Sequence, residues 1–512
     1  MQDSQQNNKQ IAKNTLLLYF RMLFMMAVSL YTSRVVLATL GVEDFGIYNV
    51  VGGIVTMFSF INSAMSSSTQ RYLTFELGRG DFSRLQKVFT TSVYIHALIS
   101  ILVVLLAETV GLWFLCNMMT IPTERMDAAM WVYQMSVLAT VVMIMSVPYN
   151  ATIIAHEKMG VFAYISILEV VLKLAIVYIL LIGDFDKLKL YAVLIFMVQL
   201  LIRLIYSKYC EKQFKESKIL KIKDGRLFKE MLGFAGWNLW GNCAFVAYTQ
   251  GVNILLNVFF NPVLNAARGI AIQVQSAVTQ FSSNFQTALN PQITKSYAAE
   301  DYKYMYNLIY KGSKFTFFLL LMLSMPIMLE TNMLLSIWLK TVPDYTTPFL
   351  RLMLCATIVD SVANPLMISA QATGKIKIYQ SVIGGILLAI LPISYIVLKL
   401  GGNPTSVFCV HLCVCIVAFG VRLLIIRSMI NLPIYEYFRS VIIRCGIVVV
   451  TSMLIPMILR ILINDSFISF VVICLASALS VVISAYVFGL NSNEQHFVKQ
   501  RALSIMKIKK TI

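Results

Sequence analysis

The sequence predicts an all-α, polytopic integral membrane protein with about fourteen transmembrane helices, built as two six-helix repeat lobes followed by two C-terminal helices. Three observations support this fold class. Hydrophobic residues make up 58% of the chain and charged residues only 13%, and the mean hydropathy is +0.76, far from the values of a soluble globular domain. Apolar windows recur along the whole chain, and two pairs of segments repeat from the first half to the second.

Apolar windows of about 20 residues, the length that crosses the hydrocarbon core, define the predicted helices in chain order. The first lobe contains windows 14–40, 45–69, 87–111, 127–154, 161–183 and 189–209. The second lobe contains windows 234–260, 263–289, 312–337, 347–371, 378–400 and 404–427. Windows 440–463 and 467–489 have no counterpart in the repeat. The predicted domains are therefore 1–225 (N-terminal lobe), 226–432 (C-terminal lobe), 433–490 (two peripheral helices) and 491–512 (a basic cytoplasmic tail).

The internal repeat is visible in two pairs of aligned segments. Pro148–Phe162 and Pro365–Tyr379 match without a gap, each with a proline in an apolar helix followed by a short turn that carries a lysine. Thr69–Phe89 aligns in the same way with Leu289–Ile309, and Asp81 falls on the aspartate of the second copy. Because such repeats are a recurring way to build alternating-access transporters, we expect two similar bundles around a central cavity.

Basic residues predict the orientation, since short loops rich in Lys and Arg remain cytoplasmic. With the N-terminus inside, most of the 42 Lys and Arg residues lie in inner segments. The predicted outer loops hold six: Arg125, Lys187, Lys189, Lys340, Lys399 and Arg460. We therefore predict that both termini are cytoplasmic.

Ionisable side chains within the predicted spans are candidate functional residues, because burying a charge in lipid is costly. The bases are Arg21, Arg34, Lys173, Arg203, Arg268, Arg351 and Arg422, and the deep acids are Glu169 and Asp360. The excess of bases favours an anionic substrate in a water-filled cavity, with Arg21, Arg34 and Arg268 as the leading candidates to line it.

Other charges in the spans have structural interpretations. Arg203 and Arg422 lie near the cytoplasmic boundary and can extend to the interface. Glu169 and Lys173 are four residues apart on one helix and can neutralise each other. For Asp360, a proton or cation relay and a hydrogen bond between helices both stay open.

Two polar stripes on equivalent spans of the repeat predict a hydrated interior. The stripe in window 263–289 includes Gln273, Gln280 and Asn284, and the stripe that ends window 45–69 includes Asn62 and Ser66. Interhelical hydrogen bonds are the alternative explanation, since they enrich such residues at helix contacts in any bundle.

Several function classes are disfavoured. The net charge of +18 is spread over the cytoplasmic loops, where anionic lipid attracts it, so nucleic-acid binding is not expected. The chain has no GxxxxGK[ST] phosphate-binding loop, and its predicted outer loops are too short for a catalytic domain, so it is not expected to be an enzyme. Cysteines surround His411, but on a helix His411 points away from Cys409 and Cys413, which favours packing over metal binding. We expect no cofactor and no metal.

Three segments resemble a known family. They are Lys13–Val55, Ser66–Asp81 and the HEKMG turn at His156–Gly160. They are similar to the Wzx-type polysaccharide and O-antigen flippases of the multidrug/oligosaccharidyl-lipid/polysaccharide exporter superfamily, and the similarity extends over essentially the whole chain. The resemblance implies two six-helix lobes around a central cavity, plus two peripheral helices.

The resemblance also implies a function. An undecaprenyl-diphosphate-linked oligosaccharide would move from the inner to the outer leaflet of the bacterial inner membrane, as in polysaccharide or lipopolysaccharide biosynthesis. Arg21, Arg34 and Arg268 would hold the diphosphate, and the polar stripes would face the glycan. We expect a monomer in the bilayer that acts beside polysaccharide assembly enzymes. The alternatives are a cation-coupled multidrug antiporter of the same superfamily and a membrane enzyme of glycan assembly.

Overall fold

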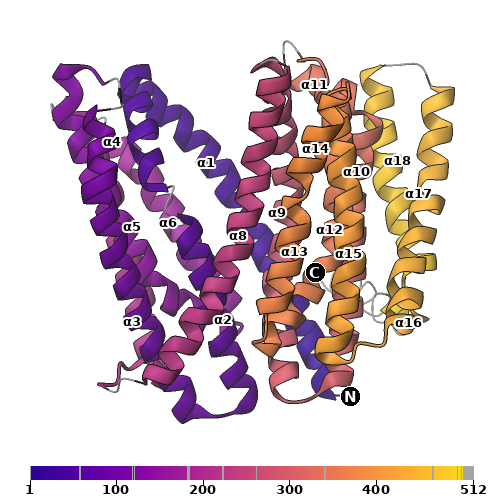
Figure 1. Cartoon of the computed structure of the whole chain (residues 1–512), viewed down its shortest axis with the longest axis horizontal. Helices are drawn as coiled ribbons and strands as arrows, with labels where there is room; N and C mark the ends of the chain where they lie inside the picture. Colours follow the sequence, from indigo (N-terminus) through magenta and orange to yellow (C-terminus); the bar gives the residue numbers. More distant parts are fainter. Residues whose placement is uncertain are drawn as a thin grey trace, which may run out of the picture. The chain divides into compact units, whose positions relative to one another are not determined.

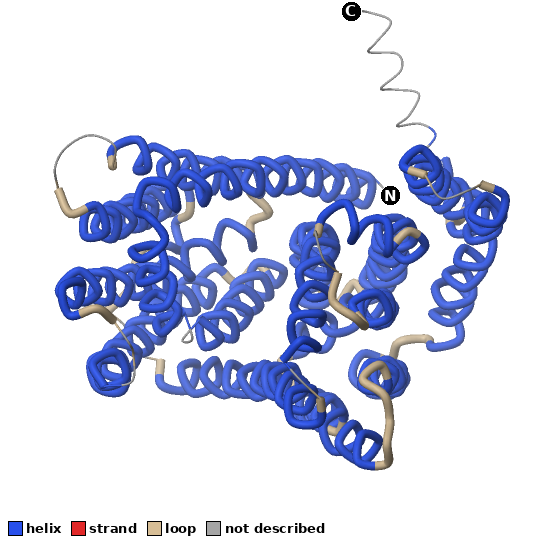
Figure 2. The backbone as a smooth tube through the Cα atoms, turned by 90° about the horizontal axis from the view of Figure 1, so that it is seen from above, coloured by secondary structure: helices blue, strands red, loops and turns tan. Residues whose placement is uncertain are grey.

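The described chain is helical, with short turns between the helices and no strand (Figure 2). The computed structural model describes residues 2–56, 59–117, 119, 121–180, 185–221, 224–260, 262–339, 342–463, 466–492, 494–496 and 499. Within these ranges, 11 helical segments are long and apolar enough to cross a membrane. The all-helical membrane fold predicted from composition is therefore confirmed.

Three predicted spans are not among these 11 segments. Two of them fall on long helices, α8 (Gly225–Phe259, 35 residues) and α9 (Pro262–Ala298, 37 residues). Both helices are long enough to span a membrane, but their polar residues lower the hydropathy of every window. The third, 45–69, begins in α1 (Gln2–Thr56) and ends in α2 (Ser59–Arg79). Polar content, rather than length, therefore sets α8 and α9 apart, whereas window 45–69 includes residues 57–58, which lie outside the described residues.

The remaining main helices follow the predicted windows closely (Figure 1). They are α3 (Phe82–Leu106), α5 (Met126–Ala155), α6 (Met159–Ile179), α7 (Lys187–Gln213), α10 (Tyr302–Leu329), α12 (Thr346–Thr373), α13 (Lys377–Leu388), α14 (Ile390–Lys399), α15 (Ser406–Ile430), α17 (Ile443–Leu462) and α18 (Phe467–Ser484). Shorter pieces complete the fold, namely α4 (Leu112–Asn117), α11 (Thr331–Trp338) and α16 (Ile434–Tyr437).

A sharp kink divides α1 where the sequence predicts the end of the first span. Gly41 has φ 81° and ψ 168°, a conformation outside the helical region. This region is essentially restricted to glycine, because a Cβ would clash with the backbone. The predicted break between windows 14–40 and 45–69 is therefore confirmed.

The chain divides into two compact units. The first contains Met1–Cys243, Thr287–Tyr304 and Gln371–Ser381, and the second contains Ala244–Gln286, Met305–Ala370 and Val382–Ile512. Five helices contribute residues to both units, namely α8, α9, α10, α12 and α13. The division into 1–225, 226–432, 433–490 and 491–512 remains a prediction.

The internal repeat is also present in the backbone. Gly80 and Glu300 are equivalent in the alignment, and both have a left-handed conformation, with φ 72° and 59°. Directly after them, Asp81 and Asp301 each accept a hydrogen bond at 3.0 Å from the backbone N–H three residues later. The second pair of repeated segments behaves in the same way, with Glu157 at φ 58° and its counterpart Gly374 at φ 78°.

Ion pairs join residues that the predicted topology places on the same side of the membrane. In the first unit, Arg125 binds Asp44 and Asp186, and all three belong to predicted outer segments. In the second unit, Arg460 binds Glu330 at 2.9 Å near two predicted outer span ends. These pairs support the alternation of spans, because a misplaced span would put the partners at opposite ends of the helices.

Reciprocal contacts join the two copies of the repeat within the first unit. From α2 of the first copy, the Arg71 guanidinium donates to the backbone oxygens of Gln371 (3.1 Å) and Ala372 (2.7 Å), at the end of α12. From α9 of the second copy, Lys295 and Gln292 each donate to the Glu157 carboxylate at 2.5 Å. Each copy therefore holds the turn that follows the proline-containing helix of the other copy.

Candidate functional site

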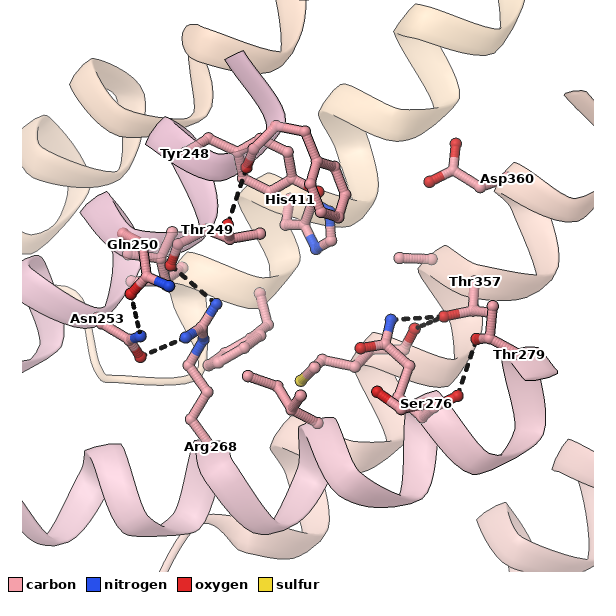
Figure 3. Close-up of a pocket in the computed structure, with 18 of the residues that line it drawn as sticks. Tyr248, Thr249, Gln250, Asn253, Arg268, Ser276, Thr279, Thr357, Asp360 and His411 are labelled. Carbon is pink, nitrogen blue, oxygen red and sulfur yellow. Dashed lines mark hydrogen bonds between the residues drawn. The ribbon is translucent and has the colours of Figure 1, made fainter. Parts of the chain in front are cut away.

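A polar cavity of about 610 Å³ lies in the second unit, between α8, α9, α12 and α15 (Figure 3). Its volume falls in the usual range for a small-molecule site, about 300–1,000 Å³. The polar residues that line it are Thr249, Gln250, Asn253, Arg268, Gln275, Ser276, Thr279, Gln280, Ser283, Thr357, Asp360 and His411. Apolar side chains, among them Phe245, Tyr248 and Phe408, form the rest of the wall.

One face of α9 supplies the floor of this cavity. Successive lining residues of α9 are three or four positions apart, the spacing that places side chains on one face of an α-helix. They are Arg268, Ile272, Gln275, Thr279 and Ser283. Gln275 is fixed across the cavity, because its Nε2 donates to Thr357 Oγ1 of α12 at 2.7 Å. This face explains why α9 is too polar to be an ordinary lipid-facing span.

Not every residue of the predicted α9 stripe faces the cavity. Gln280 lines it, Gln273 is an exposed residue of α9 outside the lining, and Asn284 is buried, with its Nδ2 donating to the backbone oxygen of Gln280 at 3.0 Å. The stripe thus combines the two expected roles, a hydrated lining and local hydrogen bonding.

Arg268 is the positive charge of the cavity. It is 5% exposed, and its side chain extends from α9 toward α8 (Figure 3). Its Nη1 donates to Asn253 Oδ1 and its Nη2 donates to the backbone oxygen of Thr249 at 3.0 Å. Asn253 in turn donates from Nδ2 to Gln250 Oε1 at 3.1 Å. In the described ranges, no carboxylate forms an ion pair with Arg268, so its charge is balanced only by dipoles.

Asp360 lies on α12, across the cavity from Arg268 (Figure 3). Its Oδ1 accepts a hydrogen bond from Arg422 Nη1 of α15 at 3.3 Å, and its Oδ2 contacts Cys415 Sγ at 3.6 Å. The Asp360 side chain is 42% exposed, whereas that of Arg422 is 13% exposed. Asp360 therefore lines the cavity and also pairs two helices, and Arg422 is engaged in this pair instead of extending to the membrane interface as predicted.

Three lining residues were not identified as candidates from the sequence. Tyr248 and His411 come from α8 and α15, with ring centroids 5.6 Å apart, and Asn253 orients Arg268. Asn253 could have been predicted from the sequence, because it forms a short polar face with Thr249 and Gln250 in an otherwise apolar segment.

Other predicted residues form a separate cluster in the first unit. Arg21 of α1 donates from Nη1 to Ser166 Oγ of α6 at 3.2 Å, and its guanidinium lies 4.6 Å from the ring centre of Phe162. Nearby on α6, Lys173 pairs with Glu169 at 2.6 Å, as the four-residue spacing predicts.

The cluster extends to α7, where Gln199 donates to Glu169 at 3.0 Å. Arg21, Glu169 and Lys173 therefore belong to the contact between α1, α6 and α7, whereas Arg268 and Asp360 belong to the cavity of the second unit.

Three further predicted residues lie on α1 and α2. Arg34 is a helical residue of α1 and Asn62 of α2, and the predictions made for their side chains fall outside what the structure describes. Ser66 is half-buried on α2. Within the described residues, no group of three or more His, Cys, Asp and Glu side chains is placed to hold a metal ion.

The chain is similar to a known protein family over part of its sequence and to several solved structures in its fold. The MatE family model matches residues 18–179. No curated protein sequence matches the chain. Among solved structures, a multidrug resistance MATE family transporter of the MOP superfamily, in an outward-facing conformation, is similar with a TM-score of 0.71 and 12% identity over 83% of this chain and 96% of its own.

Two more solved structures have a similar fold. The Vibrio cholerae MATE transporter VcmN in the bent form has a TM-score of 0.68 and 14% identity, over 84% of this chain and 98% of its own. A MOP superfamily transporter from Pyrococcus furiosus has a TM-score of 0.70 and 13% identity, over 83% and 96%, and a different function is suggested for it by the reverse polarity of its binding pocket. The chain therefore has the fold of the MATE transporters of the MOP superfamily.

Proposed function

We propose that this chain is a membrane transporter that moves an anionic cargo by alternating access. Its cargo is an undecaprenyl-diphosphate-linked oligosaccharide, carried from the inner to the outer leaflet of a bacterial inner membrane. The observation that carries the proposal is Arg268, a buried guanidinium in a polar cavity with no carboxylate partner among the described residues. Burying an unpaired charge is costly, and an anionic ligand would offset that cost.

The chemistry of the cavity fits the head group of such a cargo. Arginine presents a planar fork that binds phosphate oxygens in pairs and stays charged at physiological pH. The hydroxyl and amide groups of Ser276, Thr279 and Gln280 offer donors and acceptors to sugar hydroxyls. A volume of about 610 Å³ suits a diphosphate with its first sugars, while the prenyl chain would remain in lipid.

A second candidate is a cation-coupled multidrug antiporter. The solved structures named above favour it, since one is a multidrug resistance transporter and another is a MATE transporter. Asp360 also favours it, because a half-exposed carboxylate beside Tyr248, Phe408 and His411 could hold a cation or a lipophilic amine. The two candidates differ in the sign of the cargo, and therefore in whether Arg268 or Asp360 is essential.

The deciding experiment measures both activities in proteoliposomes. One assay follows exposure of a labelled undecaprenyl-diphosphate oligosaccharide on the opposite leaflet, and the other follows export of a lipophilic cation, each with and without a proton or sodium gradient. The variants are Arg268→Ala, Arg268→Lys, Asp360→Asn and the control Arg427→Ala, an exposed arginine at the end of α15.

The proposal predicts protein-dependent exposure of the lipid-linked sugar that falls at least about tenfold in Arg268→Ala, the loss of one charged hydrogen-bonding partner. Arg268→Lys should recover part of the rate, and Arg427→Ala should match the parent. Cation export that depends on Asp360, with no exposure of the sugar, would instead establish the antiporter.

A further inference from the structure

A second polar cavity, of about 590 Å³, lies where the two C-terminal helices begin and end. One side is formed by α16, by the π-helical turn Phe438–Ile442 and by the first residues of α17. The other side is formed by residues that follow the π-helical turn Ala485–Gly489 at the end of α18. Its lining residues are Tyr435, Glu436, Arg439, Ser440, Arg444, Asn491 and Ser492. None of them belongs to the cavity that contains Arg268.

The π-helical turn explains why two arginines face the same space. Arg439 and Arg444 are five residues apart, which would separate them by about 140° around a regular α-helix with 3.6 residues per turn. The turn Phe438–Ile442 inserts one extra residue into the helix and brings positions i and i+5 closer together around the axis. Both side chains consequently line the cavity. Such turns are rare and occur frequently at functional sites.

The positive charge of the two arginines in the cavity is only partly neutralised by the protein. The neighbouring acid Glu494 is already paired with Lys314 at 2.7 Å, and these side chains are only 7% and 1% exposed. Arg444 donates to the backbone oxygen of Gly489 at 3.4 Å. In the described part of the chain, no carboxylate forms an ion pair with Arg439 or Arg444. The lining thus holds two arginines and one acid, Glu436, and has a formal charge of one positive unit.

The walls of the cavity are anchored to the bundle. Tyr437 is fully buried, and its hydroxyl donates to Ser313 Oγ of α10 at 3.1 Å. At the opposite wall, a Cβ on Gly489 would lie 2.5 Å from Phe318, so this turn packs directly against α10. The backbone N–H of Asn491 donates to Glu494 at 2.8 Å. These contacts hold the lining in place without any ligand, which lowers the entropic cost of binding one.

A lipid-facing surface continues directly from the cavity. The exposed residues Ile443 (45%), Ile447 (42%), Val450 (64%) and Leu454 (57%) follow one face of α17 at spacings of three and four residues. Tyr435 and Phe438, beside the two arginines, are 77% and 51% exposed. Aromatic residues of this kind are typical of the membrane–water interface. The cavity therefore has a polar basic end and adjoins an apolar strip long enough for acyl chains, with α17 and α18 side by side (Figure 1).

We propose that this cavity binds the head group of an anionic phospholipid, with the phosphodiester between Arg439 and Arg444 and the acyl chains along α17. One phosphodiester carries one negative charge and matches the single unbalanced positive charge of the lining. Ser440, Asn491 and Ser492 offer hydrogen bonds to head-group hydroxyls. The predicted topology places the site at the cytoplasmic leaflet, where anionic lipids attract basic residues. The site is independent of the identity of the transported cargo.

The test uses the full-length protein in nanodiscs of phosphatidylcholine, to which short-chain phosphatidylglycerol, short-chain phosphatidylcholine or inorganic phosphate is added. Binding is read by native mass spectrometry and by the shift in the thermal unfolding midpoint. The variants are Arg439→Gln and the double variant Arg439→Gln/Arg444→Gln. Arg427→Gln is the matched control, because Arg427 is an exposed arginine of the same unit that does not line the cavity.

We expect phosphatidylglycerol, but not phosphatidylcholine, to bind the parent and the control and to raise the midpoint. Affinity should fall a fewfold in Arg439→Gln and by about tenfold or more in the double variant, since two basic contacts near the surface are lost. Because Arg439 is exposed, its single variant should fold even if the double variant does not. Equal binding to the parent and to Arg439→Gln would overturn the proposal. So would inorganic phosphate that binds as tightly as the lipid, since the site would then recognise a free anion.

Discussion

The contact between Glu157 and α9 allows a quantitative prediction. Glu157 is 8% exposed, and its two carboxylate oxygens accept hydrogen bonds from Lys295 Nζ and Gln292 Nε2, each at 2.5 Å. Asn14 of α1 donates to the backbone oxygen of the same residue at 3.2 Å. A hydrogen bond to a charged group contributes about 1.5–3 kcal/mol, but the Lys295 side chain is 26% exposed, and solvent screens part of its interaction.

We therefore expect Glu157→Gln and Lys295→Met each to reduce the free energy of unfolding by about 2 kcal/mol. The double variant should lose less than the sum, with a coupling energy of about 1 kcal/mol, because the same ion pair is removed in both single variants. Chemical denaturation in detergent micelles, followed by tryptophan fluorescence, measures the free energy of unfolding of the parent, the two single variants and the double variant, which together form a double-mutant cycle. Lys303→Met, which removes an exposed lysine at the start of α10, controls for the loss of a positive charge.

Strict additivity of the two variants, within about 0.3 kcal/mol, would contradict the expected coupling. It would mean that the carboxylate and the ammonium do not interact in solution. The same cycle also bears on alternating access, because Glu157 and Lys295 come from different copies of the repeat. If transport requires α9 to separate from the turn after α5, breaking this pair should also change how readily a thiol reagent reaches a cysteine introduced in that turn.

Three further outcomes are expected. Gly41→Ala should destabilise the protein by about 1–3 kcal/mol, because its φ of 81° and ψ of 168° are strained for any residue with a Cβ. A loss of stability below about 0.5 kcal/mol would contradict this strained conformation at residue 41. Gly78→Val should lower the thermal midpoint far more than Gly233→Val, since a Cβ at Gly78 would lie 2.8 Å from the backbone of Lys295, whereas one at Gly233 meets nothing within 4 Å. Burial alone would raise the pKa of Asp186, but hydrogen bonds from Arg125 and from the backbone N–H groups at the start of α7 outweigh it and lower that pKa. The stabilisation by the ionised Asp186 should therefore be complete above the unfolded-state pKa of 3.8 and be lost as the pH falls through the lower folded-state pKa. Thermal midpoints of Asp186→Asn should consequently depend less on pH than those of the parent below about pH 4.

The sequence determined most of the architecture. Hydropathy identifies the 11 apolar spans of the described chain, because every backbone polar group in lipid must be satisfied within a helix. The repeat was readable from two pairs of aligned segments, and the structure repeats their left-handed turns at equivalent positions. The pair Glu169–Lys173 was also predictable, because its spacing of four residues fixes the contact within a single helix.

Which charged residues contact each other depends on the tertiary structure. The sequence shows which residues share one face of a helix, but not which other helix packs against that face. Arg21 and Arg268 have the same chemistry, yet Arg21 packs on Phe162 and Ser166 of α6, whereas Arg268 reaches into a cavity beside Asn253. Asp360 could have been a lone acid in the membrane, but α15 supplies Arg422 as its partner. Helix-to-helix packing depends on side chains that are far apart in sequence, and it is this packing that separates the cavity residues from those that only hold helices together.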